Sequence, residues 1–260
     1  MREPKLAQLD STVQILGIRF FNGDVDDAIA RISQHGGFLV APSGTCFARL
    51  REDEMYRRAM VSADMAIADS ALMVVLWRLL RREKVHRISG LKYLKHLLRR
   101  FKGEGSTEVF WVLPSESARQ KLLDWSCQER FSIKTENCYV APRYGPDVED
   151  RDLLVLVEQH RPAHVIIAVG SGPQEKLGCY LRENLSYRPP IHCTGAALGF
   201  ITGDQAPIPD WADRLYLGWL WRLVAQPGVF IPRLPRAVEL PWLIWKYGEK
   251  SPPTRRRSDQ

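Results

Sequence analysis

Short apolar runs alternate along this chain with longer segments of helical periodicity, and this alternation constrains the fold more than any other feature. Apolar runs occupy residues 38–41, 65–68, 108–113 and 164–169. Each run is followed by small or polar residues and then by a helical pattern. Runs this short, apolar on both faces, are typical of parallel strands that helices cover on both sides. The sequence therefore predicts an α/β fold, a Rossmann-like parallel sheet with crossover helices.

Further segments complete this predicted fold. Residues 133–140 and 190–193 are additional strand candidates, and residues 13–21 have the pattern of a strand or hairpin arm. Ser70 is a predicted N-cap, because serine is favoured there and an apolar helical pattern follows it. Two basic stretches, 78–87 and 92–102, are expected on exposed helix ends and loops. The predicted helices are 25–34, 45–58, 71–80, 116–128 and 174–184.

The character of the chain changes after residue 210. Five of the eight tryptophans follow this point, among many arginines and lysines. We expect an α/β domain at 1–210, a C-terminal aromatic and basic helical appendage at 211–250, and a disordered basic tail at 251–260. Indole rings and cations suit the boundary between water and anionic lipid. Four tryptophans are therefore expected to face an anionic membrane surface: Trp219, Trp221, Trp242 and Trp245.

Charge and cysteine content narrow the class of protein. The net charge of +7 favours an anionic partner. The five cysteines form no CxxC pair and are expected to be buried free thiols in a reducing cytosol.

No signal peptide and no apolar run of about 18 residues is visible, so the chain is expected to lie on a membrane rather than span it. Nucleic acid is not an expected partner, because no recognition motif accompanies the charge.

Two loops follow predicted strands at the edge where open parallel sheets bind ligands. The first contains Ser43 and Thr45, and its backbone N–H groups could cradle a phosphate. The alternative for that loop is a plain turn from strand to helix. In the second loop, Asp69 lies between a buried strand and an apolar helix, a suitable place for a general base. The alternative for Asp69 is a structural carboxylate that caps the helix.

A third loop contains two glycines, Gly170 and Gly172, which let a ligand approach the backbone closely. Gln174 and Glu175 open the next helix and can bond sugar hydroxyls or an amide. The spacing does not match a dinucleotide GxGxxG fingerprint, and Ser171 lacks a complete GxSxG elbow. The alternative is an ordinary turn with a helix-start glutamate. No metal site is expected, because no metal-binding motif or carboxylate pair accompanies these loops.

The ordered set of motifs resembles the WecG/TagA/CpsF family of bacterial glycosyltransferases, which includes N-acetylmannosaminyltransferases of wall teichoic acid synthesis. The similarity extends from about residue 13 to residue 235. It is carried by Ile15-Leu-Gly-Ile18, the region through Asp69-Ser70, Arg87-Ile-Ser-Gly90, the run from Val169 to Lys176, and Leu217 to Leu223 with Pro227.

The resemblance implies transfer of a sugar similar to N-acetylmannosamine from a UDP-sugar to a polyprenyl-diphosphate-linked glycan, in surface polysaccharide synthesis. It implies no metal and no other cofactor. On this interpretation Asp69 deprotonates the acceptor hydroxyl, and Arg214 and Arg222 offset diphosphate charge. The enzyme would be cytoplasmic and peripheral on the inner face of the bacterial cell membrane, as a monomer or a homo-oligomer. The implied donor-binding residues are Ser43, Thr45, Arg87, Gly170, Gly172, Gln174 and Glu175.

Several positions depart from the family pattern. Ala41 takes the place of a threonine, so that Thr45 is a candidate for the missing hydroxyl. Three family carboxylates are replaced by Lys92, Gly199 and Gly218. The changes cluster where the donor sugar is expected to bind. A second hypothesis therefore stays open, in which the chain is a catalytically silent relative that binds a nucleotide sugar or a lipid-linked glycan.

Overall fold

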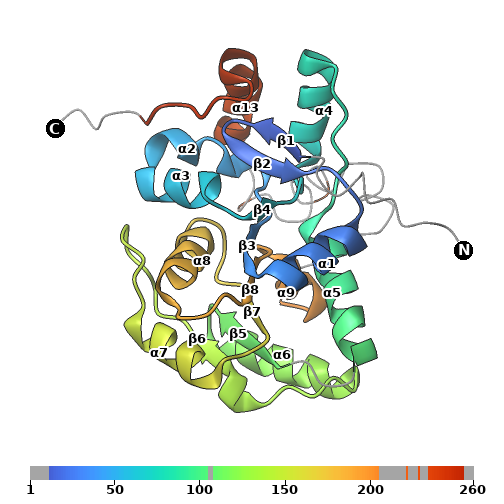
Figure 1. The fold of residues 1–260 in the computed structure, drawn as a ribbon, viewed down its shortest axis with the longest axis vertical. Helices are drawn as coiled ribbons and strands as arrows, with labels where there is room; N and C mark the ends of the chain where they lie inside the picture. Colours follow the sequence, from blue (N-terminus) through green and yellow to red (C-terminus); the bar gives the residue numbers. More distant parts are fainter. Residues whose placement is uncertain (1–11, 105–107, 205–220, 222–227, 229–233, 255–260) are drawn as a thin grey trace, which may run out of the picture.

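A computed structural model describes residues 12–104, 108–204, 221, 228 and 234–254 of the protein. The described chain alternates strands and helices almost throughout (Figure 1). Three of the predicted site residues, Arg214, Trp219 and Arg222, lie outside the described residues.

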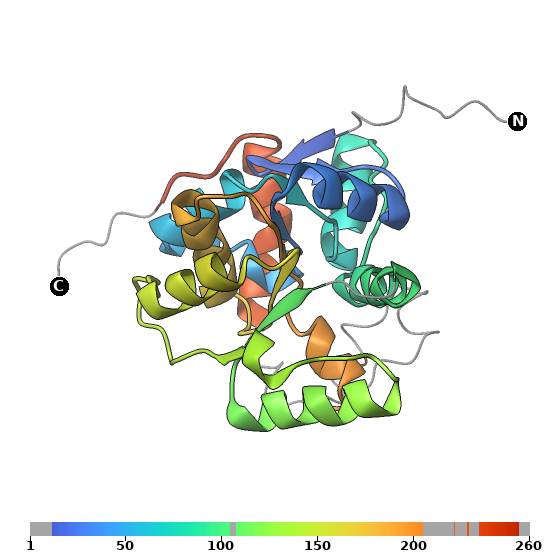
Figure 2. The same cartoon turned by 60° about the horizontal axis from the view of Figure 1, so that its bottom comes forward.

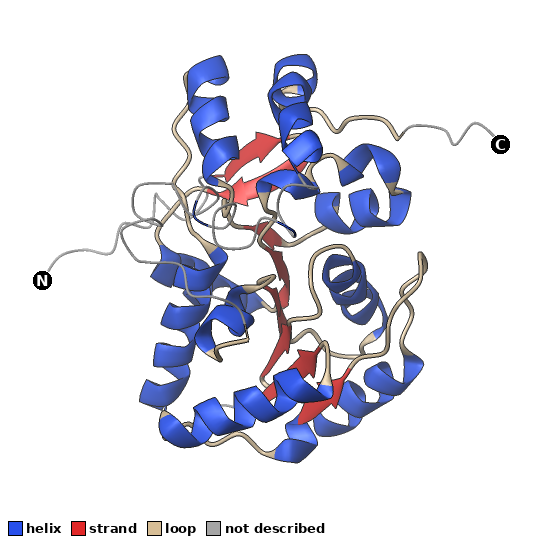
Figure 3. Ribbon diagram, turned by 180° about the vertical axis from the view of Figure 1, so that it is seen from behind, coloured by secondary structure: helices blue, strands red, loops and turns tan. Residues whose placement is uncertain are grey.

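The described strands form one continuous sheet through the centre of the molecule (Figure 3). The strands are β1 Thr12–Ile15, β2 Ile18–Phe21, β3 Gly37–Val40, β4 Met65–Ala66, β5 Val109–Leu113, β6 Cys138–Val140, β7 His164–Ile167 and β8 Pro190–Cys193. Their order is β1-β2-β4-β3-β8-β7-β5-β6. The β1–β2 hairpin is antiparallel, and the other pairings within this sheet are parallel. The prediction of a parallel sheet, with a hairpin at 13–21, is confirmed.

Each face of the sheet borders its own hydrophobic core. Val40 of β3 and Ile167 of β7 enter one core, whereas their neighbours Leu39 and Ile166 enter the other. Successive side chains of a strand point to opposite faces, so a strand covered on both sides must be apolar at every position. This double burial is the reason that the strands appear in the sequence as unbroken apolar runs.

Helices cover both faces, as Figure 2 shows from a second direction. The first core is covered by α3 Glu54–Val61, α4 Ala71–Arg81, α7 Arg151–His160, α8 Pro173–Asn184 and α13 Leu234–Tyr247. The second core is covered by α1 Val25–His35, α5 Gly90–Glu104, α6 Glu116–Gln128 and α9 Ala197–Ile201. Ser70 caps α4 as predicted, since its side chain accepts a hydrogen bond from the backbone N–H of Met73.

The helix predicted at 45–58 is wrong, because the chain breaks there into three pieces. The 3₁₀ helix η2 spans Gly44–Cys46, α2 spans Arg49–Glu52, and α3 follows. Asp53 has an extended backbone, with φ −137°, and its carboxylate caps α3 at the N–H of Tyr56. Lys176 forms a 2.5 Å ion pair with Asp53. Asp53 thus combines a local cap of α3 with an ion pair to a residue remote in sequence.

The basic stretch at 92–102 lies inside α5, so the prediction of helix ends and loops is wrong there. Leu94, Leu97 and Leu98 point into the second core, while Lys95 and Arg99 are exposed. The apolar residues recur with the spacing of one helix face. Their periodicity decides the structure, and the cations occupy the solvated side of the same helix. The predicted strand at 133–140 is also shorter, since only β6 forms.

The described part of the C-terminal segment belongs to the first core. Leu240, Leu243 and Ile244 of α13 are fully buried there. The carbonyls of Gly248 and Glu249 accept hydrogen bonds from the turn of the β1–β2 hairpin, at 2.8 Å each. The division at residue 211 stays a prediction, but α13 packs against the α/β domain.

Residues 251–254 are described and Pro252 is buried, so the ordered chain continues past the predicted start of the tail.

Two buried histidines connect neighbouring strands beneath α5. His192 Nδ1 lies 2.9 Å from Tyr93 Oη, and His192 Nε2 lies 3.0 Å from His164 Nδ1. His192 and Tyr93 have no exposed surface. Burial lowers the pKa of His192 well below its usual range, and the nearby His164 lowers it further. The folded protein therefore resists protonation of His192.

We expect acid to destabilise the protein through His192. An unfolded histidine takes up a proton near pH 6.5, whereas the folded protein keeps this ring neutral. Stability is therefore fully present above about pH 6.5 and falls as the pH drops below it, by up to about 1.4 kcal/mol per pH unit. Urea unfolding at several pH values measures how the free energy of unfolding changes with pH. In His192→Asn this dependence should be weaker, because one proton fewer is taken up on unfolding. An NMR titration of the His192 ring with a midpoint near pH 6.5 would contradict the expectation.

Candidate active site

Four loops meet at the carboxyl edge of the adjacent strands β4, β3, β8 and β7. The chain leaves β3 toward α3, on the face of the first core, and leaves β8 toward α9, on the face of the second. Neighbouring strands whose connections leave on opposite faces define a topological switch point, where open α/β sheets bind ligands. Three of these loops are the ones that the sequence singled out, and the fourth follows β8.

Asp69 lies in the loop after β4, half-buried, and is held by a backbone N–H from α5. Its Oδ1 accepts a hydrogen bond from Gly90 N at 2.9 Å. The helix cap of α4 is supplied by Ser70 instead. The carboxylate is therefore directed toward the first residue of α5, and Ser70 rather than Asp69 caps α4. A structural role of Asp69 at the start of α5 stays an alternative to the role of a base.

Gly90 stands where three chain segments approach one another. A Cβ at this position would lie 3.0 Å from Thr194 O and 3.7 Å from the Cβ of Ala41. Only a glycine fits this spacing without a shift of the neighbouring backbone. The loops after β3 and β8 thus pack directly against the residue that orients Asp69. Sequence reasoning had included Gly90 in a motif but had assigned it no role.

Arg87 lies beside Asp69. Its Nε donates a hydrogen bond to the backbone carbonyl of Asp69 at 3.2 Å, and the backbone at Arg87 forms a parallel bridge with Ala68. The side chain is half-buried. The structure therefore brings the Arg87 guanidinium to the backbone of Asp69, from a segment almost 20 residues away.

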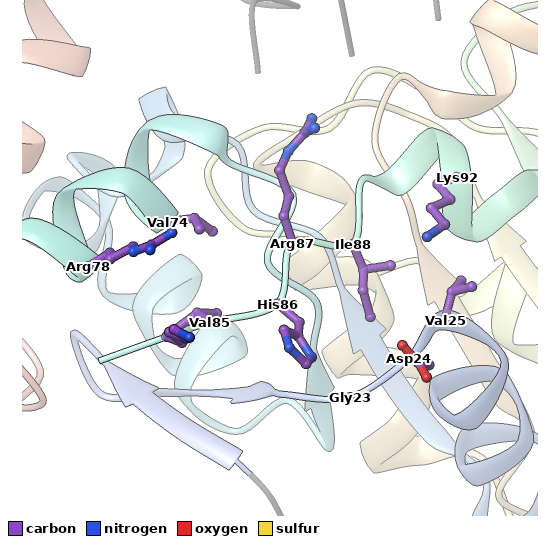
Figure 4. A pocket seen from close by; sticks show the side chains of 11 residues that line it. Gly23, Asp24, Val25, Val74, Arg78, Val85, His86, Arg87, Ile88 and Lys92 are labelled. Atoms are coloured by element: carbon purple, nitrogen blue, oxygen red, sulfur yellow. The ribbon is translucent and has the colours of Figure 1, made fainter. Parts of the chain in front are cut away.

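A cationic pocket of about 370 Å³ lies between α4 and the α1–α5 layer. Figure 4 shows Arg78 reaching toward it from α4 and Lys92 from α5, with Asp24 at its base. Asp24 is the one carboxylate among the lining residues, which are otherwise basic or apolar. Such a cavity favours an anionic ligand. The basic lining residues are Arg78, Lys84, His86, Arg87 and Lys92. The sequence predicted the basic stretches 78–87 and 92–102 on exposed helix ends and loops, and it did not predict that their residues line a common pocket.

The loop after β3 is tied to the loop after β7 by small polar side chains. Ser43 Oγ lies 3.0 Å from Cys46 Sγ, which lies 2.9 Å from Ser171 Oγ. Thr45 Oγ1 is 3.5 Å from Ser43 Oγ, at the limit of a hydrogen bond. Ser43 and Thr45 therefore do lie at the common edge, half-buried, next to the glycine loop. Cys46 and Ser171, which link them, had no predicted role.

Both glycines of the third loop have positive φ, 94° at Gly170 and 103° at Gly172. A Cβ at Gly170 would meet nothing within 4 Å, so the loop borders open space there. A Cβ at Gly172 would lie 2.1 Å from the guanidinium of Arg49, which donates a hydrogen bond to Ser171 O at 2.7 Å. Gly172 thus makes room for Arg49, and Gly170 leaves room for a ligand.

Glu175 and Gln174 hold this loop from within. Glu175 accepts hydrogen bonds from Gly172 N at 2.6 Å and from Gln174 Nε2 at 2.9 Å. Gln174 Oε1 accepts a hydrogen bond from Gly195 N at 3.1 Å, in the loop after β8. Glu175 has no exposed surface and Gln174 has 1%. Both side chains therefore connect loops, and a direct contact of either with a donor sugar stays a prediction.

Burial raises the pKa of Glu175, while its hydrogen bonds from Gln174 and Gly172 and the nearby Arg49 act in the opposite direction. A buried carboxyl that keeps a proton can still accept both hydrogen bonds. The net effect of this environment is a pKa of Glu175 above its usual range.

Two features were not found among the described residues. Among them, no group of three or more His, Cys, Asp or Glu residues is placed to hold a metal ion. Within the same part of the chain, no helix has the length and apolar character required to cross a membrane.

The fold and the site define an α/β protein with a half-buried carboxylate and a cationic pocket near the switch point of its sheet. The chain matches the model of the glycosyl transferase WecG/TagA/CpsF family over residues 13–257, and it belongs to this family. A comparison with curated proteins found no match. The family places the protein among glycosyltransferases of polysaccharide synthesis, which use a sugar donor and a glycan acceptor.

Proposed function

We propose that the protein transfers a sugar similar to N-acetylmannosamine from a UDP-sugar to a polyprenyl-diphosphate-linked glycan, without a metal ion. The observation that carries this proposal is the pairing at the carboxyl edge of the sheet. The Asp69 carboxylate is fixed by Gly90 N, and Arg87 binds the carbonyl of the same residue. A base and a cation are thus neighbours at the place where ligands bind in this fold.

The proposed reaction is a direct displacement. Asp69 takes the proton from the acceptor hydroxyl, whose oxygen attacks the anomeric carbon of the donor. The bond between that carbon and the diphosphate oxygen breaks, and UDP leaves with the electron pair. The hydrogen bond from Gly90 N holds the carboxylate in one orientation, so that little ordering is needed when the acceptor arrives.

Cations near Asp69 support binding of the diphosphate groups. Arg87 and the cationic pocket supply positive charge beside the base, and arginine pairs well with phosphate oxygens. Arg214 and Arg222, outside the described residues, are proposed to offset diphosphate charge as well. The open space at Gly170 leaves room for the donor, near Ser43 and Thr45.

Gln174 and Glu175 are proposed as positioning residues of the donor loop. Their hydrogen bonds join the loops after β7 and β8 and hold Gly172 in its positive-φ conformation. The donor would then meet a preformed surface.

Exposed tryptophans support a position on the inner face of the cell membrane. Trp245 is 69% exposed and Trp242 is 38% exposed on α13, next to Lys246. Indole rings with nearby cations are favoured at anionic lipid surfaces. Trp221 is half-buried, and Trp219 lies outside the described residues, so their membrane role rests on the sequence alone.

The test is a transfer assay with a panel of UDP-sugars and a short-chain, water-soluble polyprenyl-diphosphate glycan. Product is measured by mass spectrometry, and UDP affinity by calorimetry. Transfer from one or a few donors, undiminished by a chelator, supports the proposal and identifies the donor. UDP binding without transfer from any donor to any acceptor would favour the catalytically silent relative. Strict dependence on an added metal ion would contradict the proposed metal independence.

A further inference from the structure

Two helices that are far apart in sequence end side by side at the hairpin edge of the molecule. The guanidinium of Arg81, in the last turn of α4, donates hydrogen bonds to the carbonyls of Ile244 and Trp245, in the last turns of α13. Both helices project at this edge beside β1 and β2 (Figures 1 and 3). The C-terminal ends of α4 and α13 therefore form one projecting structure, called the α4–α13 tip below.

The tip exposes large apolar side chains on both helices. Leu79 is 71% exposed on α4, and Trp245 is 69% exposed on α13. The same two helices carry six of the eight large apolar side chains that are exposed among the described residues. On α13 the exposed residues recur at the spacing of one face, and on α4 Val75 and Leu79 do so, with Leu80 on the adjoining face. The six are Val75, Leu79, Leu80, Val238, Trp242 and Trp245.

Cations surround this apolar surface. Arg78, Arg81, Arg82 and Lys84 are exposed at the end of α4 and just beyond it, and the single acid in that stretch, Glu83, accepts a hydrogen bond from the indole of Trp77. On α13, Trp242 lies between two cations, with Arg51 at 4.9 Å and Lys246 at 4.8 Å from its ring. The tip thus combines exposed apolar groups with an excess of positive charge.

We propose that the α4–α13 tip is the membrane-binding surface of the protein, and that α4 contributes as much to it as the tryptophan-bearing α13. Apolar side chains rimmed by lysine and arginine match the acyl boundary and the anionic headgroups of a bilayer. The positive charge around these apolar groups is complementary to acidic headgroups, so the expected occupant is an anionic lipid surface. This inference rests on the proposed lipid-linked acceptor, and it assigns α4 a role that its sequence did not indicate.

The tip also has a spatial relation to the site. Val74 and Arg78 of α4 line the cationic pocket, whose wall continues to Arg87 beside Asp69. The helix begins next to Asp69 and ends at the tip, so the pocket extends along α4 between the tip and the site.

The test is flotation with vesicles of phosphatidylcholine alone or with about one third phosphatidylglycerol, at two salt concentrations. Wild type should bind the anionic vesicles, and more weakly at high salt. The double variant Leu79→Gln, Leu80→Gln should lower the partition coefficient by about tenfold or more, because both leucines lose their burial in lipid. Trp245→Gln should weaken binding to a comparable extent. The matched control is Val155→Gln on α7, which changes an apolar residue that is 51% exposed elsewhere on the molecule and should bind as wild type does.

The outcomes separate this inference from the proposed function. The leucine variant should keep wild-type transfer to the water-soluble acceptor, since exposed substitutions seldom disturb a fold. Vesicle binding equal to wild type in that variant would overturn the role of α4. Absence of vesicle binding by the wild type, with a dimer in sedimentation velocity that Leu79→Gln disrupts, would assign the tip to a second copy of the chain and also overturn it. If the wild type binds anionic vesicles but transfers no sugar to the soluble acceptor, the proposed function is refuted and the membrane-binding role of the tip is not.

Discussion

Asp69→Asn is expected to lower kcat for sugar transfer by about 10²- to 10⁴-fold, the range in which general-base catalysis contributes. The asparagine keeps a side-chain oxygen that can accept the hydrogen bond from Gly90 N, so the loop should keep its conformation. It cannot take up the proton of the acceptor hydroxyl. Steady-state kinetics with the donor found by the sugar panel measures the effect.

Three further measurements make this result specific. The melting temperature and the UDP affinity of Asp69→Asn should stay close to those of wild type, because the substitution removes a base and preserves shape. The exposed Asp147, in the loop before α7, provides the matched control, and Asp147→Asn should transfer normally. A kcat within a few-fold of wild type for Asp69→Asn would remove Asp69 from the proposed mechanism.

Glu175→Ala is expected to destabilise the protein by about 2–5 kcal/mol. The substitution leaves two buried donors without their acceptor, Gly172 N and Gln174 Nε2, and each unsatisfied donor costs about 1–3 kcal/mol. The donor loop should lose its fixed conformation as well, so UDP affinity should fall even at temperatures where the variant stays folded. Urea unfolding and calorimetry measure the two effects.

Glu175→Gln is the matched variant, because it keeps the shape and removes the titration. Burial raises the pKa of Glu175, so its stabilising contribution is fully present below about pH 4.5 and is lost as the pH rises through the folded pKa. The glutamine variant should therefore gain stability relative to wild type as the pH increases from about 4.5. A stability difference that is constant with pH, or that changes in the opposite direction, would contradict a raised pKa.

The elements that the sequence predicted well are those whose signal is local. The double burial of β3 and β7 makes their runs apolar at every position, and Ser70 caps α4 through residues only three positions away. The helix at 45–58 was mispredicted because the apolar and charged residues of this segment continue past Asp53, although Asp53 leaves the helical conformation and caps α3. The stretch 92–102 in α5 was mispredicted because its many basic residues suggested a solvated loop, although its leucines recur at the spacing of one helix face.

For the candidate site, the sequence predicted the positions of residues along the chain but not the contacts between them. The sequence placed Asp69, Ser43 and Gly170 at strand ends, because such positions follow from the order of strands and loops. It could not show that Gly90 holds the carboxylate of Asp69, or that Gln174 and Glu175 are buried between loops. Those contacts join residues that become neighbours only when the sheet is complete.

The sequence by itself determined the α/β class, the strand-end loops and the family resemblance, since periodicity, turn residues and ordered motifs are written along the chain. The tertiary structure alone decided which groups face one another. It brought Arg87 to Asp69, gathered five basic residues around one pocket, and set the last turn of α4 beside the last turns of α13. The physical reason is that hydrogen bonds, charge and apolar contact act over a few ångströms of space, whatever the distance along the chain.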